Sequence, residues 1–210
     1  MSTLLQSNAS IYGDQGQSSQ LANRFVSEWR ERHGSARIVR RDLARDPVPH
    51  LTAERFAAFA TAPAQRSPAQ NGIVAYSDGL IEELRQAQAI VLGLPMYNFG
   101  VPSQLKAYFD HVARAGVTFR YTANGPVGLL GNKQAYVFAA RGGLYAGSPL
   151  DTQSRYVRDF LRFLGISAIE FVYAEGLATG EQPRESALSA ARAQIVRLFE
   201  SSARDRAVAV

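Results

Sequence analysis

The sequence of 210 residues contains no cysteine. This absence excludes disulfides, thiol catalysis and thiolate-ligated metal sites. Long apolar runs are also missing: a run such as Ala89 to Met96 is far shorter than the ~20 residues that a membrane span needs. The first ten residues lack the basic segment and long apolar core of a secretory signal peptide. We therefore expect a cytoplasmic protein that does not bind membranes.

Several familiar sequence motifs are absent as well. The chain has no G-x-x-x-x-G-K-[ST] phosphate loop, no G-x-G-x-x-G dinucleotide fingerprint and no G-x-S-x-G nucleophile elbow. Its three histidines, His33, His50 and His111, do not have the spacing of metal ligands, so we predict structural or solvated roles for them and no metal site.

Acidic residues are fewer than basic ones, which gives a net charge of +5 and a pI of 9.7. A basic protein attracts anions, including nucleic acids and phosphorylated cofactors. The charges are scattered, however, and only Arg37, Arg40 and Arg41, and again Arg204 and Arg206, lie close together in the sequence. Because no nucleic-acid-binding motif accompanies them, we expect no nucleic-acid partner.

Short apolar segments alternate with segments of helical periodicity along the whole chain, a pattern typical of βαβ units around a parallel sheet. No linker divides the chain, so we expect one domain over residues 1–210. The predicted strands are 3–7, 37–41, 89–94, 134–140 and 168–174. The predicted helices are 18–33, 53–61, 68–88, 103–114, 149–164 and 186–202.

The order of these elements predicts a flavodoxin-like, doubly wound α/β fold: a five-stranded parallel sheet of order 2-1-3-4-5 with helices on both faces. Residues 117–131 interrupt the pattern. The Asn124-Gly125 pair between β-forming residues predicts a hairpin insertion there, which we expect beside the crevice.

Ligands of open α/β sheets bind outside the carboxyl ends of the strands. The predicted topology brings three loops together at that edge, 8–18, 95–100 and 141–145. In the first loop, the start of the following helix presents free N–H groups suited to a phosphate. Ser10 and Ser18 add hydroxyl groups there. The alternative for this loop is an ordinary connection with Ser18 as the helix N-cap.

The second loop carries Met96, Tyr97, Asn98 and Phe99. Asn98 and the backbone amides suit the polar edge of a flat ring system, and Met96 and Phe99 suit its faces. The alternative is that Tyr97 and Phe99 only cover the core.

The third loop begins with Arg141, Gly142 and Gly143. Paired glycines allow another molecule to approach the backbone closely, and their N–H groups suit a ring edge that becomes anionic on reduction. A tight strand-to-helix connection is the alternative.

Residues 95–130, PMYNFGVPSQLKAYFDHVARAGVTFRYTANGPVGLL, closely resemble the FMN-dependent NADH-azoreductases, also described as FMN-dependent NADH:quinone oxidoreductases. The resemblance extends through 10–21, 141–143, 163–166 and 174–176. It implies a flavodoxin-like fold and a homodimer with one non-covalently bound FMN per subunit near the dimer interface. It also implies two-electron, ping-pong reduction of quinones and azo compounds by NADH or NADPH.

The same resemblance implies roles for individual residues. The FMN phosphate would bind to Ser10, Gly16, Gln17 and Ser18. The isoalloxazine would bind to Met96, Tyr97, Asn98, Phe99, Ala140, Arg141, Gly142 and Gly143. The substrate pocket over the ring would include Phe119, Tyr121 and Phe163. Ala9, Gly16 and Ala140 stand where the family usually has serine, so backbone N–H groups or water would replace those hydroxyls.

A second class of function fits the same fold. A flavodoxin-type electron carrier binds flavin but has no NAD(P)H-dependent turnover of its own. Such carriers tend to be acidic and to have a phosphate loop rich in threonine and serine, whereas this chain is basic and lacks such a loop. The sequence therefore favours an enzyme.

Overall fold

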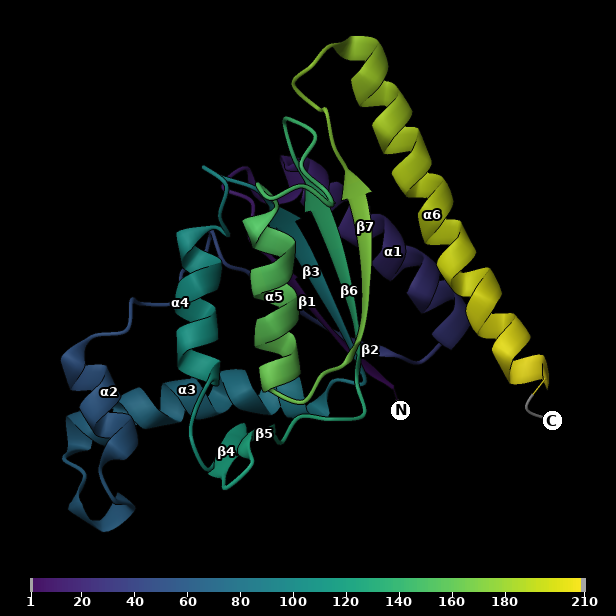
Figure 1. Ribbon diagram of the computed structural model, residues 1–210. Coiled ribbons are helices and arrows are strands. Elements are labelled where there is room, and N and C mark those ends of the chain that lie inside the picture. The colour runs from purple at the N-terminus through teal and green to yellow at the C-terminus, as the bar shows by residue number, and fades with distance from the viewer. Residues whose placement is uncertain (1, 209–210) are drawn as a thin grey trace.

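A computed structural model describes the backbone of residues 2–208 and the side chains of residues 2–200. Its centre is a parallel sheet of five strands in the order β2-β1-β3-β6-β7 (Figure 1). This order confirms the predicted 2-1-3-4-5 topology. The strands are β1 (Thr3–Asn8), β2 (Arg37–Asp42), β3 (Ala89–Pro95), β6 (Gln134–Ala140) and β7 (Ala168–Ala174).

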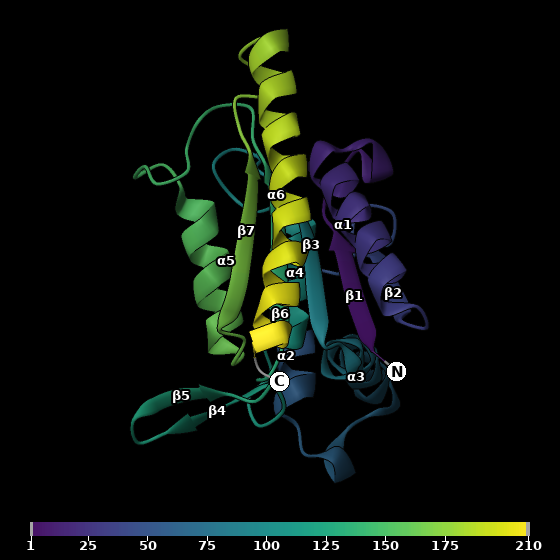
Figure 2. The ribbon, with the colours of Figure 1, turned by 90° about the vertical axis from the view of Figure 1, so that its right-hand side faces the viewer.

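Helices cover both faces of the sheet (Figures 1 and 2). One face packs against α1 (Gln17–His33) and α6 (Glu181–Val208). The other packs against α3 (Pro68–Gln86), α4 (Ser103–Val112) and α5 (Thr152–Phe163), and the short helix α2 (Ala53–Ala60) lies on α3. Within residues 2–208, none of the helices combines the length and the apolar character needed to cross a bilayer.

The sheet is apolar on both sides because successive side chains of a strand point to opposite faces. In β3, Ile90 and Leu92 pack toward α3, α4 and α5, whereas Ala89 and Val91 pack toward α1 and α6. Sheets covered on both faces are typical of parallel βαβ folds. The continuous apolar run of β3 in the sequence follows from this double burial.

The last helix differs from the prediction. It begins at Glu181, five residues before the predicted start, and it continues to Val208. Its first turn is polar and contains Pro183, so apolar periodicity begins only further along the helix. Proline is tolerated there because the first-turn N–H groups have no acceptor within the helix.

The insertion after α4 is a hairpin, as predicted, made of β4 (Phe119–Thr122) and β5 (Gly125–Gly128). The prediction that it lies beside the crevice is wrong. Figures 1 and 2 show it at the opposite edge, where the strands of the main sheet begin. Because α4 runs antiparallel to the strands, its end at Val112 has already returned the chain to that edge.

Backbone contacts fix the hairpin to the end of α5. Leu130 N donates to Leu164 O at 2.8 Å. A Cβ atom placed on Gly128 would lie only 2.0 Å from Gly165 N, so the two backbones touch and leave no room for a side chain. The glycine at 128 is therefore required by close approach.

Phe25 of α1 is a sensitive point of the core. Its ring is fully buried and packs against Tyr136 at 4.4 Å, Phe199 at 4.8 Å and Phe138 at 5.3 Å between ring centroids. We expect Phe25→Ala to lower the free energy of unfolding by about 3–5 kcal/mol, because it leaves a cavity among these rings. Urea denaturation measures the change.

The matched control is Phe56→Ala, which removes an exposed ring. It should change the same free energy by no more than about 0.5 kcal/mol. Equal effects of the two substitutions would contradict this account of the core.

Candidate functional site

Three loops meet where the strands of the sheet end. They follow β1, β3 and β6, and the strand register aligns Pro95 with Ala140 and Ala140 with Ala174. The hydroxyl of Tyr97 joins the first two loops, since Ile11 N donates to it at 3.1 Å. Met96 N donates to Ala140 O at 3.0 Å and joins the second loop to the third. The three loops thus form one connected surface at this edge of the sheet, for which we keep the name of the predicted site, the crevice.

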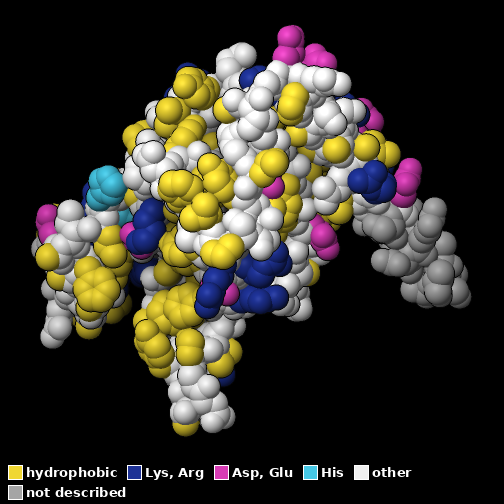
Figure 3. Space-filling model, turned by 45° about the horizontal axis from the view of Figure 1, so that its top comes forward, with side chains coloured by type: hydrophobic (Ala, Val, Ile, Leu, Met, Phe, Trp, Pro, Cys, Tyr) yellow, Lys and Arg dark blue, Asp and Glu magenta, His cyan; other side chains and the backbone are white. Residues whose placement is uncertain are grey.

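Hydrophobic side chains are exposed around this crevice. Figure 3 brings this edge of the molecule forward and shows apolar groups spread among backbone and polar atoms. Ile11 and Tyr12 come from the first loop, Phe99 from the second, and Leu144 and Leu150 from the third. Such a rim suits a flat, largely apolar ligand or another protein surface.

The first turn of α1 has no side-chain cap. Its N-cap is Gly16, which contradicts the alternative with Ser18 in that position. By contrast, Thr52, Ser67 and Asp151 cap α2, α3 and α5 by accepting a backbone N–H bond. We call a backbone N–H group free when it bonds to no acceptor in the described part of the chain.

The N–H groups of Gln17, Ser18 and Ser19 are free in this sense. The positive end of the helix dipole lies at the same point. The start of α1 is therefore a candidate anion site.

Ser10 and Gly16 are packed directly against each other beside this anion site. A Cβ atom on Gly16 would lie 2.1 Å from Ser10 Oγ, so any larger residue must displace the buried serine. Ser10 Oγ accepts from Tyr12 N at 3.2 Å and lies 3.5 Å from Tyr97 Oη. Its hydroxyl therefore holds the loop in shape. Gly16 allows the loop to pass close to the hydroxyl.

Buried polar groups support the first loop from below. Gln6 of β1 donates from Nε2 to Asn23 Oδ1 at 2.6 Å, and Asn23 Nδ2 donates to Asp14 Oδ1 at 3.1 Å. This chain of bonds links the sheet to the turn that precedes Gly16. It gives a structural reason for the polar Gln6 in a buried strand, a role that sequence reasoning missed.

The second loop is a tight, strained turn. Tyr97 and Gly100 bond each other through N–H and carbonyl groups at 3.2 and 3.0 Å. Asn98 and Phe99 between them have φ angles of +50° and +65°. Asparagine tolerates this left-handed conformation, but it is unfavourable for phenylalanine. The N–H groups of both residues are free. Strain of this kind persists where the surrounding structure enforces it, often at functional sites.

The third loop directs its N–H groups to one side. The carbonyl groups of Arg141, Gly142 and Gly143 all accept bonds from the segment 176–178. In a trans peptide the next N–H points away from the carbonyl. The N–H groups of Gly142, Gly143 and Leu144 therefore point away from 176–178, and all three are free.

The side chain of Arg141 lies under the third loop and is completely buried. Its guanidinium bonds to Asp151 at 2.8 Å, Glu175 at 3.0 Å and Ser154 Oγ at 2.7 Å, and it lies 5.0 Å from the ring centre of Tyr173. The guanidinium of Arg141 therefore does not face the crevice. It stabilises the loop instead.

Glu175 and Asp151 complete this buried cluster. Glu175 Oε1 also accepts from Tyr145 N and Ala146 N, each at 2.9 Å, and so fixes the path of the third loop. Burial raises the pKa of Asp151, but hydrogen bonds from Arg141 and Ser154 outweigh this and hold the pKa below its usual value. Sequence reasoning did not assign these roles, although Asp151 and Ser154 have the spacing of a helix cap.

Three of the predicted pocket residues are not at the crevice of their own chain. Phe119, Tyr121 and Phe163 do form one aromatic cluster, with ring centroids 5.4 Å apart for Phe119–Tyr121 and 4.2 Å for Phe119–Phe163. The cluster lies on the hairpin and the end of α5, at the opposite edge of the sheet (Figure 1).

The described histidines and carboxylates form no metal site. His33 stacks on Trp29 at 4.0 Å, and its Nδ1 lies 2.9 Å from Trp29 O. His111 is buried, its Nδ1 lies 3.0 Å from Ala107 O, and burial lowers its pKa. These two histidines have structural contacts, as predicted.

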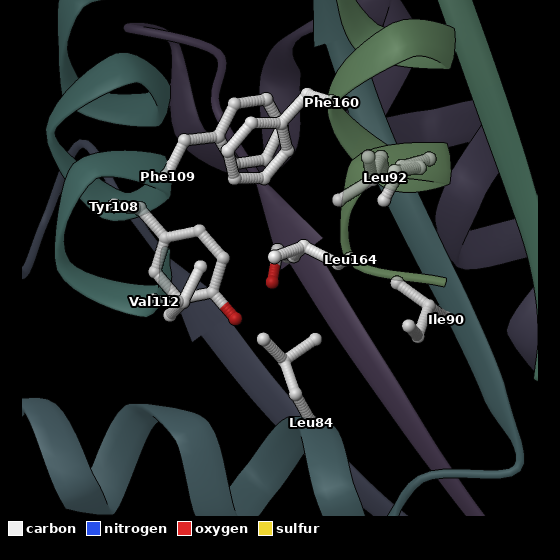
Figure 4. Close-up of a pocket in the computed structure, with 10 residues that line it drawn as sticks. Leu84, Ile90, Leu92, Tyr108, Phe109, Val112, Phe160 and Leu164 are labelled. Atoms are coloured by element: carbon white, nitrogen blue, oxygen red, sulfur yellow. The ribbon is translucent and has the colours of Figure 1, made fainter. Parts of the chain in front are cut away.

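A small cavity inside the core is separate from the crevice. It lies between the sheet and helices α3, α4 and α5, among apolar side chains such as Leu84, Leu92 and Phe109 (Figure 4). Its volume of about 10 Å³ suits one water molecule. Tyr108 and Ser7 line it. A cavity of this size is too small for a substrate.

The geometry of the crevice defines the ligand that it fits. The candidate anion site lies at the start of α1, and two further sets of free N–H groups come from the second and third loops. Exposed aromatic and aliphatic side chains surround them. A planar ring with polar edges and an anionic tail satisfies all of these groups together.

Comparison with known proteins shows close relatives. The family model described as flavodoxin-like fold matches residues 2–199. An FMN-dependent NADH:quinone oxidoreductase of Cellvibrio japonicus (strain Ueda107) is 54% identical over 195 residues, which cover 93% of this chain and 97% of the relative. Another, from Alcanivorax borkumensis (strain ATCC 700651 / DSM 11573 / NCIMB 13689 / SK2), is 52% identical over 188 residues, covering 90% and 95%.

Solved structures show the same similarity. An azoreductase from Bacillus anthracis str. Sterne superposes with a TM-score of 0.86 at 27% identity, covering 94% of this chain and 98% of that one. An FMN-dependent NADH-azoreductase from Bacillus anthracis str. Ames Ancestor in complex with FMN has a TM-score of 0.84 at 25% identity, with coverage of 94% and 99%.

The contribution of the buried Asp151 carboxylate to stability can be tested by its dependence on pH. Asn can still cap α5, so Asp151→Asn removes the charge and keeps the cap. We expect it to lower the free energy of unfolding by about 2 kcal/mol at neutral pH. The difference in the free energy of unfolding between the two proteins should persist as the pH falls to 3.8, the ordinary pKa of the group. It should disappear as the pH falls further, through the lower pKa of Asp151 in the folded state. Urea denaturation at several pH values measures it.

Asp46→Asn provides the control, because that carboxylate is 80% exposed and lies 3.8 Å from Arg41, whereas Asp151 is 8% exposed. An exposed pair contributes little to stability. If both variants lost equal stability at neutral pH, the special role of the buried cluster would be refuted.

Proposed function

Because this chain belongs to the family with the flavodoxin-like fold, we propose that it is an FMN-dependent NADH:quinone oxidoreductase that also reduces azo compounds. One structural observation carries the proposal: three sets of free backbone N–H groups surround a single crevice with an apolar rim. The names of the relatives supply the activity, and the crevice supplies groups that fit the cofactor.

The free N–H groups of Gln17, Ser18 and Ser19 would hold the FMN phosphate, with Ser10 and Gly16 shaping the loop beside them. These backbone N–H groups would donate to the phosphate in place of the serine hydroxyls that Ala9 and Gly16 lack. The ring would lie against Met96, Tyr97, Asn98 and Phe99 on one side. Ala140, Arg141, Gly142 and Gly143 would contribute backbone contacts on the other, where Leu144 N–H is also free.

When bound, FMN would supply the redox chemistry, since the flavin itself accepts the hydride and passes the electrons on. The chain positions the ring and stabilises its charge. Preorganised N–H groups that face developing negative charge are effective in catalysis, because they need no reorganisation during the reaction. The free N–H groups of Gly142, Gly143 and Leu144 have this property, since bonds to 176–178 and Glu175 fix their loop in advance. We assign charge stabilisation to them.

The apolar rim supports a ping-pong order. NADH or NADPH and the quinone or azo compound both present a flat ring, and both would stack in the same opening beside Phe99 and Leu144. Two substrates that share one position must bind in turn. The electron donor therefore leaves before the acceptor binds.

A homodimer would complete the pocket. Phe119, Tyr121 and Phe163 lie too far from the crevice of their own chain to line it, yet the ring of Tyr121 is 74% exposed. A second copy can present this aromatic cluster to the exposed rim of the first. We propose that the substrate pocket lies between two copies of the single domain formed by residues 1–210.

The catalytic proposal is tested with the protein purified and saturated with FMN. Under anaerobic conditions, NADH should remove the visible absorbance of the bound flavin, and a quinone should restore it. Initial rates against both substrates should give parallel double-reciprocal lines. A flavodoxin-type carrier would oxidise NADH slowly or not at all. Protein that stays colourless after incubation with excess FMN would refute the proposal, and intersecting lines would refute only the ping-pong order.

The dimeric pocket is tested by Tyr121→Ala. Removing an exposed ring that contacts the partner's crevice should raise the KM for quinone several-fold, without changing FMN affinity or thermal stability. Val127→Ala is the matched control, because Val127 pairs with Arg120 on the other face of the same hairpin. Sedimentation velocity should show a dimer for all three proteins. A monomeric wild-type enzyme with full activity would contradict this model.

A further inference from the structure

The first turn of α5 bonds to both loops that border the crevice. Asp151 and Ser154 contact the guanidinium of Arg141 under the third loop. The two residues between them contact the second loop: Thr152 Oγ1 donates to Phe99 O at 2.5 Å, and Gln153 Nε2 donates to Pro95 O and Gly100 O. Four consecutive residues thus fix two loops that lie 10 to 58 positions away in the chain.

Gln153 is the buried member of this group, with 1% of its surface exposed. Its Nε2 donates at 2.8 Å to the last residue of β3 and at 3.0 Å to the last residue of the strained turn. Its Oε1 bonds to nothing in the described residues. Two donated bonds to carbonyl groups settle the orientation of the amide. A buried amide oxygen without a hydrogen bond lowers the stability of the fold, so core packing alone does not explain a glutamine at this position.

The turn that Gln153 holds contains the two left-handed residues, Asn98 and Phe99. Within the turn itself, only the two bonds between Tyr97 and Gly100 oppose relaxation of this conformation. Gln153 bonds to Pro95, two residues before the turn, and to Gly100 at its end, and Thr152 bonds to the carbonyl of Phe99. The directions of the free N–H groups of Asn98 and Phe99 therefore depend on α5.

We propose that Gln153 is a positioning residue for the flavin ring, which acts by holding the turn 97–100 so that the N–H groups of Asn98 and Phe99 face the crevice. This inference rests on the proposed function. Gln153 does not touch the crevice surface itself, because it is buried beneath the turn. It sets the environment of the bound ring through the backbone that it holds.

The test compares Gln153→Met with Gln194→Met. Methionine has a similar length and removes the amide in both cases. Gln194 donates to Phe171 O at 3.0 Å from α6, so its replacement also removes a glutamine-to-backbone bond, but away from the crevice. FMN binding is measured by quenching of flavin fluorescence. Visible circular dichroism at saturating FMN then reports the environment of the ring.

We expect Gln153→Met to raise the FMN dissociation constant roughly ten-fold, in line with the loss of two hydrogen bonds, and to change the circular dichroism of the bound flavin. Gln194→Met should leave both unchanged even if it lowers the melting temperature. A purely structural role for Gln153 would reduce stability without altering the spectrum of the saturated protein. That result would overturn the proposal.

Thr152→Val provides a second variant if Gln153→Met fails to fold. Thr152 is exposed, and valine keeps its shape while removing the bond to Phe99 O. We expect a dissociation constant raised about three-fold, with a smaller change in the same spectrum. Unchanged values would again overturn the positioning role. Wild-type protein that binds no FMN would refute the proposed function instead, so the two failures are distinguishable.

Discussion

The common register of the parallel strands is the constraint on which the crevice depends. Pro95, Ala140 and Ala174 lie side by side at the ends of β3, β6 and β7, so the loops that follow leave the sheet at one level. β1 joins the same edge through the pairing of Asn8 with Gly93. A register shift in any strand would move a whole loop and reverse the faces of its side chains. Burial of both faces of the sheet makes such a shift costly.

Several backbone N–H groups at this edge of the sheet bond to no acceptor in the described residues. Side chains cap α2, α3 and α5, whereas α1 begins after Gly16 and leaves three N–H groups free. The second loop holds two non-glycine residues in a left-handed conformation, and the third turns its carbonyl groups away from the crevice. Each feature reduces stability locally and supplies a directed donor. The buried cluster around Arg141 holds the third loop in this arrangement.

Much of the fold could be predicted from local patterns. Apolar strands and periodic helices are visible in the sequence because double burial leaves few polar positions in the strands. The location of the hairpin was also accessible, since a segment after α4 must start at the edge where the strands begin. The polar first turn of α6 gave no apolar signal. The roles of Arg141 and Gln153 were not accessible, because their partners, such as Glu175 and Pro95, are 34 and 58 positions away.

The contact between Gly128 and Gly165 has a mechanical consequence. Two backbones that touch without intervening side chains leave no compliant layer between the hairpin and α5. Any group added at either glycine would tilt β4 and β5 as one body, and the displacement would grow toward the tip beyond Tyr121. The orientation of the aromatic ring of Tyr121 is thus set by two glycines that carry no side chain.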